Sequence, residues 1–222
     1  MLSVALLITF GSLVSLSPNV YADDNVDSPA ASGVCQAPGY RFHVGETQLE
    51  MTAGHCIGGE QNNPYWWQYS EGIDGLLRVV PDQQGNVFNF NLNNGSLYHF
   101  APNRVATWDD ITTGKSICSI EGSSGSRCGQ ILRTDYTPSY VPRHTASFLL
   151  IDASCQEGDS GAVWIDGVTA IGVTSGYVNA TGQCIVTPIP AILQATGLGD
   201  TLQFNVASSP CNGKGTGPFG GC

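Results

Sequence analysis

One segment holds much of the information in this sequence: Cys155-Gln156-Glu157-Gly158-Asp159-Ser160-Gly161-Ala162. Glycines on both sides of Asp159-Ser160 let the backbone make a sharp turn that presents the Ser160 hydroxyl. Such a turn also leaves the amides of Gly158 and Ser160 free to point at a developing oxyanion. Taken alone, Gly-Asp-Ser-Gly is more often an ordinary turn, so the prediction of a nucleophile needs a second motif.

That second motif is Thr52-Ala53-Gly54-His55-Cys56, which precedes the serine segment in the chain. A serine hydroxyl is a weak nucleophile at neutral pH, so it needs an imidazole within hydrogen-bond reach to take its proton. The order His then Ser argues against an esterase with a strand-turn-helix nucleophile, because there the His follows the Ser.

Together, in this order and with a cysteine beside each, the two motifs resemble the chymotrypsin-like serine peptidases. The nearer likeness is to the bacterial branch of alpha-lytic protease and the streptogrisins. Residues 155–162 of this chain resemble the nucleophile segment of that branch. Residues 170–176 resemble its substrate-binding strand, and residues 113–129 resemble its cysteine hairpin. The resemblance covers roughly Cys35 to Leu198. It implies a serine endopeptidase with His55 as general base, Ser160 as nucleophile, and Gly158 and Ser160 as the oxyanion hole.

Composition predicts an all-β protein. Gly 28 and Pro 12, with few helical repeats, favour short strands joined by turns. The resemblance implies two six-stranded antiparallel β-barrels (a chymotrypsin-like double barrel) with the site between them, and residues 191–196, ended by Gly197, are the one expected short C-terminal helix. The strands are expected at 40–44, 48–51, 65–69, 76–80, 87–92, 97–100, 116–120, 130–134, 147–151, 162–165, 169–174 and 185–188.

The chain divides into four expected regions. Residues 1–22 form a signal peptide cleaved before Asp23, since their apolar run is too short and too broken for a membrane anchor. A short acidic arm follows at 23–34. The peptidase domain spans 35–207, with an N-terminal barrel at about 35–94 and a C-terminal barrel at about 95–207, and 208–222 form a tail. We therefore expect a secreted, extracellular protein.

The chain has eight cysteines, all after residue 22. An even number in an exported chain implies disulfides, although sequence alone leaves about 105 pairings open. No two cysteines have the close spacing of a zinc knuckle, so no metal is expected. The resemblance selects Cys35 with Cys56, Cys118 with Cys128, and Cys155 with Cys184. Cys211 and Cys222 are left by elimination, and their pairing would close the tail.

The third catalytic residue departs from the family pattern. Asp82 is the favoured acid, because it follows what we take as the second strand after the histidine motif. Asp74 is the alternative: its local sequence fits better, but it comes early after His55. A chain that lacks a catalytic acid is the third alternative, and each aspartate alone is more often a turn residue.

Asp159 would be partly buried, so it needs a cation to remain ionised. The bacterial branch uses an arginine directly after the first hairpin cysteine, where this chain has Ser119. Arg127 and Arg133 are the substitutes, and the sequence does not choose between them.

The resemblance assigns substrate binding to Ser175, Gly176 and Tyr177, opposite Ala153-Ser154. The pocket has no aspartate at its base and Tyr177 at its mouth, which favours small uncharged side chains. The other histidines, His43, His99 and His144, have no accompanying motif and are read as structural or surface residues.

The net charge of -10 and the scattered basic residues argue against nucleic acid as a partner. We expect a protein or peptide substrate, no cofactor, no stable membrane insertion and a monomer. The competing interpretation is a catalytically impaired peptidase-like binding or adhesion module, which kept the fold and lost its acid. The retained His55, Gly158 and Ser160 favour the enzyme.

Overall fold

Strands account for most of the regular structure in the computed structural model. It describes residues 27–29, 35, 39–56, 62–69, 72–81, 86, 88–91, 97–120, 125–141 and 147–206. Only one α-helix occurs in these residues, α1 (Ile189–Thr196), and no helix among them is long and apolar enough to cross a membrane. The all-β expectation is therefore confirmed.

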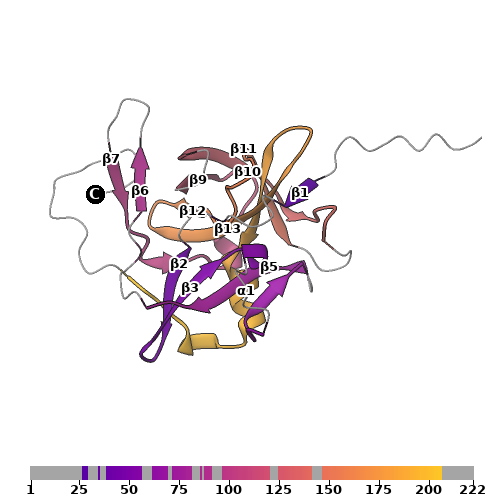
Figure 1. Cartoon of the computed structure of the whole chain (residues 1–222). Helices are drawn as coiled ribbons and strands as arrows, with labels where there is room; N and C mark the ends of the chain where they lie inside the picture. Colours follow the sequence, from indigo (N-terminus) through magenta and orange to yellow (C-terminus); the bar gives the residue numbers. More distant parts are fainter. Residues whose placement is uncertain are drawn as a thin grey trace, which may run out of the picture.

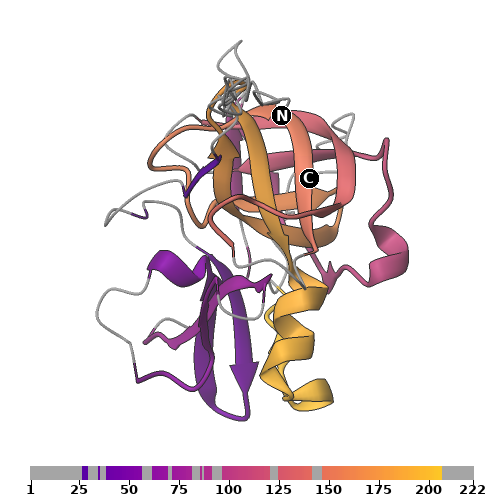
Figure 2. The ribbon, with the colours of Figure 1, turned by 90° about the vertical axis from the view of Figure 1, so that its right-hand side faces the viewer.

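The C-terminal half forms a closed barrel. Its six strands are β9 (Ser116–Ile120), β10 (Arg127–Tyr136), β11 (Phe148–Ser154), β12 (Val163–Asp166), β13 (Thr169–Val178) and β14 (Gln183–Pro188). They pair in the order β13-β12-β9-β10-β11-β14, and pairing between β13 and β14 closes the ring, as Figure 2 shows in the upper part of the molecule.

The N-terminal half differs from expectation. It contains a five-stranded sheet in the order β15 (Gln203–Phe204), β2 (Tyr40–Val44), β3 (Thr47–Thr52), β5 (Asp74–Val79) and β4 (Trp66–Gln68). A separate hairpin joins β6 (Phe88–Asn91) to β7 (Leu97–Phe100). No pairing among the described residues closes this sheet into a second barrel. The expected division near residue 94 also falls between two strands that pair with each other.

Two apolar cores explain how the halves hold together. Successive residues of β12 point to opposite faces, as the period of a strand requires. Trp164 lies in the barrel interior, while its neighbours Val163 and Ile165 pack outward in a cluster with Phe42, Met51 and others from the first sheet. The barrel wall is thus buried on both faces, and the first sheet is fixed against it.

The chain ends also cross between the halves. The short strand β1 (Asp27–Pro29) pairs with β13 of the barrel, and β15 pairs with β2 of the first sheet. Figures 1 and 2 show α1 beside the first sheet, below the barrel. The helix begins two residues before the expected start, with Pro190 in its first turn, and ends at Gly197 in the left-handed conformation at φ 64°. Three strands were not predicted from the sequence: β1, β15 and β8 (Arg104–Val105), which are only two or three residues long.

Candidate active site

His55 is placed by a tight turn at the end of β3. The turn is a 3₁₀ segment over Gly54–Cys56. A side chain at Gly54 would put its Cβ 2.0 Å from the Trp67 carbonyl oxygen, so only glycine fits. Trp66 donates its indole N–H to the Gly54 carbonyl over 2.8 Å. The backbone before His55 is therefore fixed against β4.

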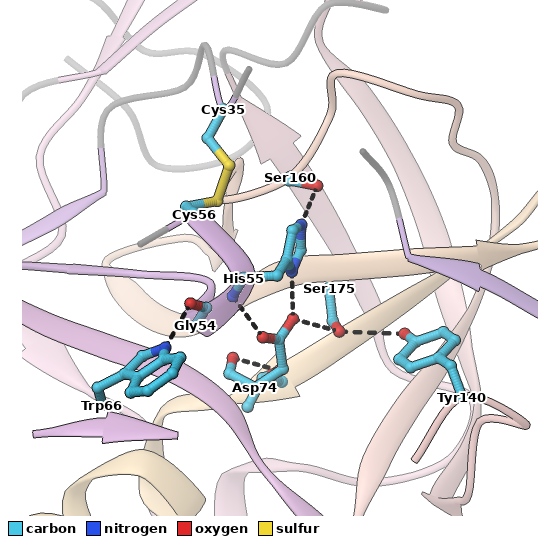
Figure 3. Close-up of polar contacts among 10 residues, drawn as sticks. Cys35, Gly54, His55, Cys56, Trp66, Asp74, Tyr140, Ser160 and Ser175 are labelled. Carbon is cyan, nitrogen blue, oxygen red and sulfur yellow. Dashed lines mark hydrogen bonds and ion pairs between the residues drawn. A yellow bond between two sulfur atoms is a disulfide. The ribbon is translucent and has the colours of Figure 1, made fainter. Parts of the chain in front are cut away.

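Three side chains form one connected line at the junction of the halves (Figure 3). The distance from His55 Nδ1 to Asp74 Oδ2 is 2.7 Å, and from His55 Nε2 to Ser160 Oγ it is 2.6 Å. The His55 backbone N–H also donates to Asp74 Oδ1 over 2.9 Å. The side chain of His55 is 4% exposed and that of Asp74 is fully buried. Water is thus largely excluded from the bonds that orient the imidazole.

The aspartate against His55 is Asp74, the alternative candidate, and not the favoured Asp82. β5 runs antiparallel to β3, with Thr52 opposite Leu76 and Leu49 opposite Val79. Asp74 begins β5 and so lies at the end of β3 that carries His55. The end of β5 points away from the site. Asp82 itself lies outside the described residues.

Asp74 is held by groups from the barrel as well as by His55. Ser175 of β13 donates its hydroxyl to Asp74 Oδ2 over 2.6 Å, and Thr187 of β14 donates to the Asp74 carbonyl over 3.0 Å. Because a hydroxyl has one hydrogen, the Tyr140 hydroxyl must donate to Ser175 Oγ, 3.0 Å away. This chain of donors fixes the carboxylate in one orientation.

The bonding assigns the histidine tautomer. A carboxylate only accepts hydrogen bonds, so Nδ1 carries the hydrogen and Nε2 is left to accept from Ser160. Burial disfavours the charged imidazole, but the Asp74 charge and hydrogen bond outweigh it and raise the pKa of His55 above its ordinary value. The imidazole is therefore a stronger base than a free histidine.

Ser160 lies in a turn that two glycines make possible. Gly158 has φ 90° and Gly161 has φ 81°, where other residues are strained. The amide of Asp159 bonds to the Gln156 carbonyl and that of Gly161 to the Thr174 carbonyl, which fixes the turn on both sides of Ser160.

The chain is similar in sequence to two streptogrisins. No family model matches the sequence. Streptogrisin-C of Streptomyces griseus is 37% identical over 89 residues, which is 38% of this chain and 19% of that protein. Streptogrisin-D of the same organism is 24% identical over 186 residues, 77% of this chain and 46% of that protein. The chain thus spans less than half the length of either streptogrisin.

Solved structures extend the likeness over most of the chain. Thermobifida fusca protease A superposes with a TM-score of 0.58 at 23% identity, covering 78% of this chain and 98% of that protein. Cellulomonas bogoriensis chymotrypsin gives 0.56 at 22% identity, with 83% and 97% covered. An alpha-lytic protease homologue gives 0.54 at 18% identity, with 77% and 98% covered. The fold is that of the chymotrypsin-like serine peptidases.

One ion pair neutralises the aspartate that precedes Ser160. The buried carboxylate of Asp159 lies 2.9 Å from Arg127, whose side chain is 12% exposed, whereas Arg133 pairs with the exposed Asp135. Arg127 stands directly opposite Ser119 in the β9–β10 ladder. Of the two arginines that the sequence left open, Arg127 is therefore the one that pairs with Asp159.

Three disulfides are present: Cys35–Cys56, Cys118–Cys128 and Cys155–Cys184. They are the pairs implied by the chymotrypsin-like resemblance. Cys211 and Cys222 lie outside the described residues. Sulfur atoms of Cys35 and Cys56 come within 4.8 Å of a ring nitrogen of His55. Because the two sulfurs are bonded to each other, this trio offers no thiolate ligands.

The three residues expected to bind substrate all lie on β13 but have different neighbours. Ser175 faces Asp74, while Gly176 and Tyr177 continue β13 along the barrel edge.

Of the other histidines, His43 has a structural role. It links β2 to the C-terminal segment through Asn205 and through Gln203, whose side-chain oxygen is 2.9 Å from His43 Nε2. His144 lies outside the described residues, as does the side chain of His99.

Two tyrosines at the site had no sequence signal. The Tyr69 ring stacks on His55 with centroids 6.0 Å apart and planes at 18°, and Tyr140 meets Tyr69 edge-on at 5.0 Å. Tyr69 has φ 58°, an uncommon value for a bulky residue. Burial, and then the Asp74 charge, raises the pKa of Tyr69 well above its ordinary value, so the phenol stays neutral. Tyr69 therefore covers one face of the imidazole, and Tyr140 packs against Tyr69.

Proposed function

We propose that this chain is an exported serine endopeptidase that hydrolyses peptide bonds through an acyl-enzyme on Ser160. The observation that carries the proposal is the line from Asp74 through His55 to Ser160, with bonds of 2.7 and 2.6 Å. Hydrogen-bond contact between nucleophile and base, with the base oriented by a third group, is the geometry that activates a serine.

Each group has one part in the reaction. His55 Nε2 takes the Ser160 proton as the oxygen attacks the peptide carbonyl, and Asp74 stabilises the imidazolium that forms. The amides of Gly158 and Ser160 bind the oxyanion. His55 then gives the proton to the departing amine. In the second half of the reaction His55 takes a proton from water as the water oxygen attacks the acyl group, and it returns that proton to the Ser160 oxygen.

The substrate in this proposal is an extended peptide that adds to the edge of β13 at Ser175, Gly176 and Tyr177. Backbone hydrogen bonds along such an edge bind a peptide whatever its sequence. We further propose a preference for small uncharged side chains at the cleavage site, in a pocket between this strand and Ala153-Ser154. The three disulfides support export to an oxidising compartment.

The binding-module alternative depended on the loss of the acid. The buried contact of Asp74 with His55 removes that reason. Labelling with a fluorophosphonate separates the two functions, because the reagent reacts with activated serines.

We expect the purified protein to be labelled at Ser160. The S160A and H55A variants should not be labelled. S119A is the control variant, since Ser119 is also a fully buried serine but belongs to β9 and is not part of the line from Asp74 to Ser160. It should be labelled like the parent. Peptidase activity should fall by several orders of magnitude in S160A and in H55A. The double variant should lose about as much activity as either single variant. Failure to label the parent protein would reject the proposal.

A further inference from the structure

The edge of β13 that the proposed substrate would use is already occupied. β1 pairs antiparallel with it, placing Asp27 opposite Val178, Ser28 opposite Tyr177 and Pro29 opposite Gly176. Figure 1 shows β1 against the barrel strands. The occupant belongs to the acidic arm that precedes the first disulfide.

The direction of β1 matters as much as its position. From Asp27 to Pro29 the opposing residue on β13 changes from 178 to 176, so the arm runs toward Ser175. Ser175 donates to Asp74 and therefore marks the catalytic end of the edge. The arm thus enters the site along the strand that the proposed substrate would pair with.

The bonding pattern follows from Pro29. Opposite residues in an antiparallel pair alternate between exchanging two backbone hydrogen bonds and exchanging none. Pro29 has no N–H, so its pair with Gly176 is of the second kind. Ser28 and Tyr177 are then the pair that exchanges both bonds. While they do, Tyr177 cannot offer the same two groups to a substrate.

We infer that residues 27–29 are a tethered competitor that occupies the substrate edge of β13 and must leave before a peptide can bind. The inference rests on the proposed function. Cys35, six residues after Pro29, is bonded to Cys56 beside His55, so the arm cannot diffuse away. A short tether holds a segment at an effective concentration in the millimolar range, enough for a weak three-residue strand to compete.

The test compares S28P with S28A in the full exported chain. Proline at 28 removes the N–H that bonds to Tyr177, whereas alanine keeps it. If the arm covers the edge nine-tenths of the time, its release should lower KM for a peptide substrate about tenfold with kcat unchanged. S28A should match the parent. Intact mass verifies that residues 27–29 are present in each protein.

A second measurement separates this inference from the proposed function. A small fluorophosphonate needs Ser160 and His55 but not the edge of β13, so parent, S28P and S28A should be labelled at the same rate. A synthetic peptide of residues 23–32 should raise KM for S28P and have less effect on the parent.

Equal labelling with equal KM in all three proteins overturns the competitor and leaves the peptidase standing. A fall in kcat for S28P would also overturn it, because it would make the arm a structural part of the site. Absence of labelling in all three rejects the proposed function and this inference with it.

Discussion

Replacing Asp74 with asparagine is the sharpest perturbation of the proposed mechanism. Asp74 Oδ1 accepts from the His55 backbone, and Oδ2 accepts from His55 Nδ1 and Ser175. Asparagine has one acceptor oxygen and one amide nitrogen that only donates. If its oxygen faces the backbone N–H, its amide donates to Nδ1, which moves the ring hydrogen to Nε2. Nε2 can then no longer accept the Ser160 proton.

The opposite orientation of asparagine fares no better, because its amide would face the His55 backbone N–H in a fully buried place. The expected loss in kcat is about 10⁴-fold, or about 5.4 kcal/mol of transition-state stabilisation. Turnover of a peptide anilide measures it, and circular dichroism checks that the fold persists.

D82N is the matched control for D74N, since it makes the same chemical change at the acid that the sequence favoured. We expect D82N to keep its turnover. The reasoning is refuted if D82N loses activity while D74N retains more than a tenth of it.

Three other outcomes are expected. The parent's kcat/KM should rise with pH as His55 loses its proton, because only the neutral imidazole accepts a proton from Ser160. Asp74 raises the pKa of His55, so the midpoint of this rise should lie above the usual value of about 6.5. A midpoint below that value would contradict the effect of Asp74. In a denaturant titration, R127M should lower the free energy of unfolding by about 3–5 kcal/mol, because it leaves the Asp159 carboxylate buried without its cation. The control R133M should change the free energy of unfolding little, since Arg133 pairs with an exposed aspartate. Equal effects of the two variants would count against the ion pair. Replacing Cys35 and Cys56 by serine should cost roughly 3 kcal/mol, since the bridge closes 21 residues of chain, and an unchanged thermal midpoint would disprove it.

The sequence predicted the parts of the fold that depend on local pattern. The positions of β2, β7 and β9 match the expected ranges, whereas the longest strands, β10 and β13, extend beyond theirs. The strands that were missed have too few residues to alternate, and their positions depend on distant partners: β1 needs β13 and β15 needs β2. Closure of the barrel is likewise a long-range pairing that no local pattern contains.

The histidine and serine motifs could be identified from the sequence, because their chemistry requires particular neighbouring residues. The catalytic acid could not be identified in this way. Its position depends on which end of β5 lies beside His55, and that follows from the antiparallel register with β3. Arg127 is an intermediate case. Once Cys118 and Cys128 are taken as a facing pair, the residue after the first cysteine must face the residue before the second, which points to Arg127.

The pairing of β15 with β2 sets an order on how the chain can mature. His43 of β2 is held by Gln203 and Asn205, so the sheet that carries His55 and Asp74 receives its edge strand from the other end of the chain. Because a chain is synthesised from its N-terminus, this edge is supplied only after the last barrel strand, β14, has been made. The sheet that carries His55 and Asp74 therefore receives its last strand after every strand of the barrel has been made.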